Sequence, residues 1–358
     1  MSGSLPPLGY GLTGVLSANA ASVSQHVANL TEQVSSGLVS QDYAGLGAAA
    51  RTALDLQPQI ATQQTLQTDV QAATGRLGVA QSALTQISSV VSGITSQLGG
   101  VATLSPSGVA TLAASARSAL QQVAGLLDTT DGGVYVFAGQ DSANPPIPQP
   151  DAILSSGFYT QISSAVAGLS ANGAAATSAA TLAVAGSTAP GTSPFSASLE
   201  ALAAAGGGRA SIPTGQGVSV PGVMLANQNG DVQSTGTGTT GSYFRDILGG
   251  LASLAALTPA SASASGLQAF AQSVSSTLTS ASDTMNADAG VLGNRQTALS
   301  DTATAIGDTT TALQSQLSGI EDADLAQVST QLSLSQTQLQ ASYQMIASLR
   351  SLSLANYL

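Results

Sequence analysis

The chain lacks cysteine, tryptophan and lysine, and only 7% of its 358 residues are charged. Without cysteine it can form neither a disulfide nor a thiolate metal site. Its basic residues are seven arginines spaced singly along the chain: Arg51, Arg76, Arg117, Arg209, Arg245, Arg295 and Arg350. At a net charge of −11 this pattern offers no basic stripe for phosphates, so we expect no nucleic-acid partner.

Long hydrophobic runs are also missing. Ser, Thr and Gln interrupt every apolar stretch before the ~20 residues that a membrane-spanning helix needs, so we expect no membrane contact. The mildly apolar residues 14–23 have the outline of a secretory signal peptide. No basic residue precedes Arg51, however, and Pro6 and Pro7 occupy the place of the basic region. We therefore expect the N-terminus to remain uncleaved.

Both ends of the chain carry apolar residues at steps of three, four or seven, which is typical of one helix face. The N-terminal stripe consists of Leu12, Leu16, Ala20, Val23, Val27, Leu30, Val34 and Leu38. The C-terminal stripe consists of Leu325, Val328, Leu332, Leu339, Ile346, Leu349 and Leu352, and the apolar pattern continues through Leu354, Tyr357 and Leu358. Except for Ala20, we expect all these residues to form an assembly interface, because each face needs a partner to cover it.

The most regular stripe alternates steps of four and three over more than four heptads, about 50 Å of helix. It consists of Leu66, Val70, Ala73, Leu77, Ala80, Leu84, Ile87, Val91, Ile94 and Leu98. Gly99 and Gly100 predict its end, and Ser105-Pro106 predicts the cap of a further helix. The residues from Leu267 to Leu292 carry another stripe, so we expect 259–358 to be almost entirely helical.

The centre of the chain follows another pattern. Residues 134–137 and 217–225 predict short strands, Asn229-Gly230 predicts a hairpin turn, and residues 243–257 predict an amphipathic helix. The sequence thus predicts a mainly α fold of long antiparallel terminal helices, which form a coiled-coil-like bundle with a central mixed α/β domain inserted. The expected segments are 1–133 and 259–358 for the two helical arms and 134–258 for the variable domain.

Several features could indicate an enzyme, but none has the required context. G-x-G-x-x-G occurs at 9–14 and at 236–241, yet a dinucleotide site needs a preceding strand, and only eight residues precede the first match. His26 is the only histidine and adjoins an apolar stripe. Asp322 and Asp324 are better placed to stabilise the start of the last helix. We expect a structural protein without catalytic residues, cofactor or bound metal.

The terminal sequences resemble the bacterial flagellin family. The segment L-T-E-Q-V-S-S-G-L at 30–38, followed by D-Y-A-G-L at 42–46, is similar to the family's R-L-S-S-G and D-D-A-A-G-L segments. Gln33 and Tyr43 depart from that pattern by replacing a basic and an acidic residue. The tail segments I-E-D-A-D-L-A at 320–326, Q-L-Q-A-S-Y at 338–343 and L-S-L-A-N-Y-L at 352–358 are more similar still. The Y-V-F-A-G at 135–139 resembles the branch of the family that joins hook to filament.

The resemblance implies a structural subunit of the extracellular bacterial flagellum, exported through an uncleaved N-terminus. It would form a ring of copies between a hook-side junction protein and flagellin, and an export chaperone would accompany it. A filament-forming flagellin is the alternative within the family. A coiled-coil adhesin is a further alternative, but it would need a membrane anchor.

Overall fold

The computed structural model describes residues 8–100, 105–209, 211–215, 218–222, 224–236 and 238–355. The chain divides into two compact units. Unit 1 combines residues 1–65 with 306–358, and unit 2 consists of residues 66–305. These units group segments by packing, whereas the three segments expected from the sequence follow chain order and remain a prediction.

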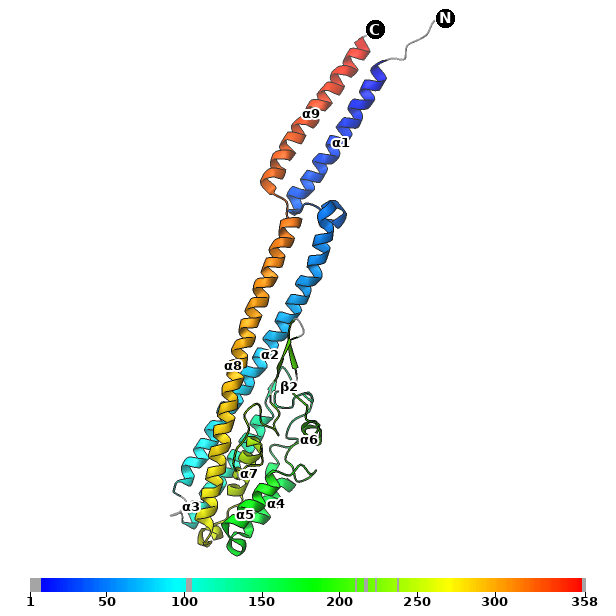
Figure 1. Ribbon diagram of the computed structural model, residues 1–358. Helices are drawn as coiled ribbons and strands as arrows, with labels where there is room; N and C mark the ends of the chain where they lie inside the picture. Colours follow the sequence, from blue (N-terminus) through cyan, green and yellow to red (C-terminus); the bar gives the residue numbers. More distant parts are fainter. Residues whose placement is uncertain are drawn as a thin grey trace. The chain divides into compact units, whose positions relative to one another are not determined.

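Unit 1 contains the two terminal helices, α1 (Leu8–Ser36) and α9 (Leu325–Ala355), which pack side by side (Figure 1). It also contains the short η1 helix (Tyr43–Ala49), the beginning of α2 (Ala50–Leu98) and the end of α8 (Leu267–Glu321). The α2 helix has 49 residues, begins well before the first residue of the predicted seam, Leu66, and continues through Pro58.

Unit 2 is organised around the predicted heptad seam of α2. Every residue of that seam is buried except Leu66, which is half-buried. The predicted stripe of α8 from Leu267 to Leu292 is buried as well. The two helices run antiparallel, since Gln67 Nε2 donates to the Ala303 carbonyl while Ser88 Oγ lies 3.5 Å from Ser282 Oγ. The α3 helix (Pro106–Leu127) begins as predicted, with the Ser105 hydroxyl accepting from the Gly108 N–H.

The segment between α3 and α8 is more helical than its composition indicated. It forms α4 (Gly157–Ala167), α5 (Leu169–Ala185), α6 (Ala197–Ala204) and α7 (Tyr243–Ala255), with 3-10 turns at Ile153–Ser155 and Pro259–Ser263. Two antiparallel hairpins provide the strands of the described residues: β1 (Thr130–Asp131) with β2 (Val134–Tyr135), and β3 (Ser211–Gly215) with β4 (Val218–Pro221). The fold class expected from the sequence is confirmed: the long terminal helices pack together, and the central region of the chain combines helices with short strands.

The helix predicted at residues 243–257 is present as α7, although no face of it meets solvent. Every residue of α7 is buried, because α3, α4 and α5 pack around it. The glycines of α7 permit this close approach. A Cβ atom at Gly249 would lie 2.6 Å from the Cβ of Ala185, and one at Gly250 would lie 2.8 Å from a methyl carbon of Leu278.

Candidate assembly surface

The helices α1 and α9 meet along the predicted stripes. On α1, Ala20 and Leu30 are buried while Leu16, Val23 and Val27 are half-buried. On α9, one residue of the stripe is buried and four are half-buried: Val328, Leu332, Leu339, Ile346 and Leu349. Each stripe therefore covers part of the other within a single chain.

Two serines complete the seam of α9. Ser335 is buried and Ser342 is half-buried, so positions 328, 332, 335, 339, 342, 346 and 349 alternate steps of four and three. Neither serine was predicted from the sequence, because the apolar stripe does not include polar side chains. Small hydroxyl side chains at seam positions let the helices approach but contribute little apolar burial.

The other predicted interface residues have different surroundings. Val34 and Leu325 are exposed, and Leu38 is half-buried. Leu12, Leu352 and Leu354 lie in α1 or α9, but their side chains are outside the described part of the structure. Tyr357 and Leu358 lie outside the described residues altogether.

Large exposed apolar side chains flank the seam, and the sequence analysis did not single them out. Leu334 is 66% exposed, Val15 59%, Tyr343 55% and Met345 52%. At 3.6 residues per turn, Leu334 and Met345 lie on one side of the α9 seam and Tyr343 lies on the other. No periodic signal marks these positions, because each side carries only one or two apolar residues.

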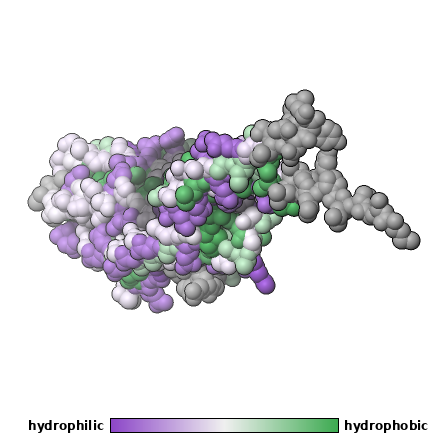
Figure 2. All heavy atoms as spheres, turned by 90° about the horizontal axis from the view of Figure 1, so that it is seen from above, coloured by the Kyte–Doolittle hydropathy of each residue, from purple (hydrophilic) through white to green (hydrophobic). Residues whose placement is uncertain are grey.

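The large apolar side chains that are exposed among the described residues all lie in unit 1. They are Val15, Val34, Val39, Tyr43, Leu54, Leu325, Leu334, Tyr343 and Met345. Figure 2 shows hydrophobic patches that interrupt the hydrophilic surface on the face that it draws. Exposed apolar surface in quantity is typical of interaction sites, so unit 1 is the candidate assembly region of the described residues.

Two backbone hydrogen bonds join the turn that follows α1 to the turn between α8 and α9. The Val39 N–H donates to the Glu321 carbonyl at 2.7 Å, and the Ala323 N–H donates to the Gly37 carbonyl at 2.8 Å. Asp324 begins α9 as predicted, because its Oδ1 accepts from the N–H groups of Ala326 and Gln327. These contacts hold α1 and α9 together at one end of the pair.

In unit 2 the Asn229-Gly230 turn does not form the predicted hairpin. The N–H groups of Gly230, Asp231 and Val232 instead donate to the carboxylate of Asp288 on α8, at 2.6, 2.7 and 2.8 Å. Asp288 is only 2% exposed. A Cβ atom at residue 230 would lie 2.7 Å from Asp288 Oδ2, so the turn needs glycine there. Consecutive N–H groups around a carboxylate form an anion-binding nest, and this one fastens the central segment to α8.

A buried ion pair holds the centre of unit 2 together. The Arg245 guanidinium donates to both oxygens of the Glu200 carboxylate at 2.6 Å and lies 5.1 Å from the ring centre of Phe195. Arg245 also donates to the carbonyls of Asn227 and Ser187. All of these partners belong to the same chain, so the pair has a structural role.

The Y-V-F-A-G segment at 135–139 is part of this core. Val136, Phe137 and Ala138 are buried, and the Phe137 carbonyl accepts from the Ala226 N–H. The ring of Phe137 meets that of Phe244 edge to face at 5.8 Å. The segment thus determines how the central region packs and does not line the assembly surface of unit 1.

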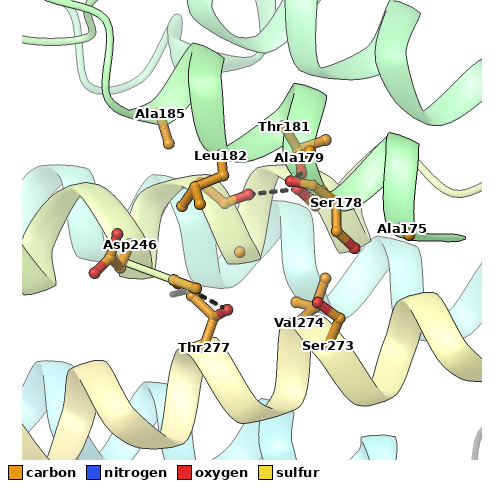
Figure 3. Close-up of a pocket in the computed structure, with 14 residues that line it drawn as sticks. Ala175, Ser178, Ala179, Thr181, Leu182, Ala185, Asp246, Ser273, Val274 and Thr277 are labelled. Carbon is orange, nitrogen blue, oxygen red and sulfur yellow. Dashed lines mark hydrogen bonds between the residues drawn. The ribbon is translucent and has the colours of Figure 1, made fainter. Parts of the chain in front are cut away.

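A pocket of about 330 Å³ lies between α5, α7 and α8 (Figure 3). Its walls are mostly Ala, Gly, Ser and Thr, and one carboxylate, that of Asp246, faces it. Burial raises the pKa of Asp246, although hydrogen bonds from Thr239 and Thr240 oppose the shift. Because these threonines already bind the carboxylate, the pocket is best explained by small side chains that leave the space between the three helices unfilled.

The enzyme-like motifs have structural places. The glycines at 9–14 lie within α1, and those at 236–241 lie in the loop that binds Asp246. His26 is exposed on α1. Among the described residues there is no group of three metal-binding side chains, and no helix there is long and apolar enough to span a bilayer.

Comparison with known families decides the identity. The model described as "Bacterial flagellin N-terminal helical region" matches residues 11–142, and "Bacterial flagellin C-terminal helical region" matches residues 275–358. Together they cover more than half of the chain. The chain belongs to the flagellin family. This family is structural and non-enzymatic, so the chain is a structural subunit of the bacterial flagellum, outside the cell.

A solved structure supports the same fold. The putative flagellar hook-associated protein from Vibrio parahaemolyticus aligns with a TM-score of 0.51 at 11% sequence identity. The alignment covers 78% of this flagellin-family chain and 99% of that one. A search of curated proteins gave no match.

Proposed function

We propose that this flagellin-family protein forms the junction between hook and filament, as an adapter on which flagellin assembles. The observation that carries assembly is the confinement of large exposed apolar side chains to unit 1. The resemblance of Y-V-F-A-G at 135–139 and of the tail to junction proteins favours this branch of the family. The solved relative is likewise named as hook-associated.

In this proposal copies form a ring, with a hook-side junction protein on one side and flagellin on the other. The predicted residues of the two terminal segments, from Leu12 to Leu38 and from Leu325 to Leu358, form the interface together with the flanking residues Leu334, Tyr343 and Met345. Burying one such large side chain contributes ~1.5–3 kcal/mol, so a few of them per contact are enough to hold neighbours. An export chaperone would cover the same surface before assembly, and export would use the uncleaved N-terminus.

The second candidate is a filament-forming flagellin, because the family models match both kinds of subunit. Copy number and position separate the two. A junction protein occupies only the distal rim of the hook, whereas a flagellin occupies the whole shaft. The adhesin considered above gains no support from the family match.

Labelling the protein on isolated flagella tests the proposal. Label confined to the distal rim of the hook is the expected result, and label along the shaft would identify a flagellin. Deleting the gene gives a second readout. Cells that keep hooks and release flagellin into the medium have lost a junction protein, whereas cells with nothing to release have lost the flagellin itself.

A further inference from the structure

Sulfur that an oxidant can attack is scarce in this chain. The sequence has no cysteine and four methionines, so methionine supplies all of its sulfur. Two methionines lie in the core of unit 2, because Met224 is 3% exposed and Met285 is 0% exposed. Met345 on α9 is 52% exposed, and Met1 lies outside the described residues. Among the residues that the structure describes, Met345 is therefore the one sulfur-containing side chain that solvent reaches.

Met345 is part of an apolar face that α1 and α9 form together. Leu334 lies on the same side of the α9 seam, about three turns before Met345. Met345 directly precedes the half-buried Ile346 of that seam. On α1, Val15 directly precedes the half-buried Leu16. In two antiparallel helices, residues that directly precede seam positions lie on the same side of the pair, so Val15 is on the side of Met345.

The height of these side chains along the pair also agrees. The Ala323 N–H donates to the Gly37 carbonyl, so these two residues are level. Val15 precedes Gly37 by as many residues as Met345 follows Ala323, and the helices rise equally per residue, so Val15 and Met345 are about level. Leu334 is about 16 Å away along α9. Met345 thus lies at the end of the apolar face where both helices contribute a side chain.

Hydrogen peroxide converts an accessible methionine to its sulfoxide. The lone pair of the thioether sulfur attacks one peroxide oxygen, the O–O bond breaks, and the other oxygen leaves as water after a proton transfer. The sulfur loses two electrons and the peroxide gains them, so the reaction needs no further reactant. The product replaces a flexible apolar side chain by a polar one and disrupts apolar interfaces.

We propose that Met345 is an oxidation site that decides whether a free subunit joins the flagellum. The inference rests on the proposed function in one respect, namely that other subunits cover this face on assembly. In the free subunit the exposed sulfur gains a polar oxygen, and burying that oxygen without a hydrogen-bond donor is unfavourable. In the flagellum the same side chain is covered, so peroxide reaches it slowly. Oxidised subunits are kept out, whereas assembled subunits are protected.

Peptide mass spectrometry after treatment with dilute hydrogen peroxide tests the site in the full chain. In the free protein, Met345 is expected to be oxidised at least tenfold faster than Met224 and Met285, which serve as internal controls. In isolated flagella, Met345 is expected to be oxidised at least fivefold more slowly than in the free protein. Equal rates for the three methionines, or equal rates for Met345 in the two states, would overturn the proposal.

Binding to hooks tests the consequence of oxidation. Free protein is treated with peroxide, separated from it, and added to hooks isolated from cells that lack the gene. Treatment is expected to lower binding of the wild type at least fivefold, and methionine sulfoxide reductases are expected to restore it. Met345→Leu has no sulfur at this position but keeps the other three methionines, so its treated and untreated forms should bind equally. Unchanged binding of the treated wild type, or a variant as sensitive to peroxide as the wild type, would refute the proposal.

Failure of this inference is distinguishable from failure of the proposed function. If untreated protein binds the hooks and oxidation changes nothing, the junction role stands and the inference is wrong. Label along the whole shaft would refute the junction role alone, because neighbouring subunits would still cover Met345. Absence of the wild-type protein from flagella would refute both.

Discussion

Replacing Asp288 by Asn probes the contact that fastens the central segment to α8. The substitution keeps the size of the side chain but removes its charge and replaces one acceptor oxygen by an amide donor. The Asp231 and Val232 N–H groups share Oδ1 and can keep their acceptor, whereas the Gly230 N–H, which donates to Oδ2, then faces a donor. A hydrogen bond to a charged group contributes ~1.5–3 kcal/mol, and an unsatisfied buried donor costs ~1–3 kcal/mol. We expect Asp288→Asn to lower the free energy of unfolding by about 2–4 kcal/mol.

Urea denaturation measures this loss, and hydrogen exchange at residues 230–232 locates it. Asp283→Asn is the matched control, because Asp283 is exposed on the same helix and its loss should change stability by less than ~0.5 kcal/mol. Gly230→Ala should destabilise by a similar amount to Asp288→Asn, and the two effects should not add, because both disrupt one contact. If Asp288→Asn is as stable as the control, the carboxylate does not anchor the turn.

Four further predictions concern pH, the core, the surface and salt. Burial raises the pKa of Asp128 to about 6, although the hydrogen bond from the Ile147 N–H opposes the rise. The protonated carboxyl therefore stabilises the fold fully below pH ~4, and this stabilisation is lost as the pH rises through 6. Asp128→Asn should have a higher melting temperature than the wild type at pH 8 but not at pH 4. Leu84→Ala should cost ~2–5 kcal/mol in a denaturation curve, because Leu84 is fully buried in the α2 seam, and a cost below ~1 kcal/mol would contradict the seam. Leu334→Ser with Tyr343→Ser should reduce incorporation into flagella without changing the melting of unit 2, whereas Gln336→Ser, at an exposed polar position of the same helix, should change neither. Assembled protein should remain assembled in molar NaCl, because apolar burial holds the subunits together. If a sedimentation assay shows that salt dissociates the assembly, charge interactions hold the subunits together instead.

The helices were predictable where one apolar face repeats over several turns. The seam of α2 is the clearest case, because its unbroken alternation of steps of four and three leaves no other period that fits. The start of α3 was predictable for a local reason, since the Ser105-Pro106 pair fixes the backbone there. Such signals depend only on neighbours in the sequence.

The central region was less predictable because its packing depends on distant residues. α4 and α5 lie in an uncharged stretch of small residues whose helices are stabilised by contact with α7. The burial of α7 on every side could not be read from its own pattern. The role of Asn229-Gly230 as an anion-binding turn depended on Asp288, which is 58 positions from Gly230 and looks like an ordinary surface acid in the sequence.

The assembly surface was predictable in location but only partly in detail. The stripes of α1 and α9 identified the right helices, yet their residues pack partly on each other within the chain. The exposed side chains on the flanks of the seam, such as Leu334 and Tyr343, carry no periodic signal. They became visible only when the exposure of each side chain was known.

Hydrogen exchange of α1 and α9 in the free and the assembled protein tests the central claim most directly. Isolated helices are marginal in water, and these two bury little beyond their mutual seam, so their amides should exchange rapidly in the free subunit. In flagella the same amides should be as protected as those of residues 66–98. Equal protection of α1 and α9 in both states would contradict the account, because no further burial would then occur on assembly.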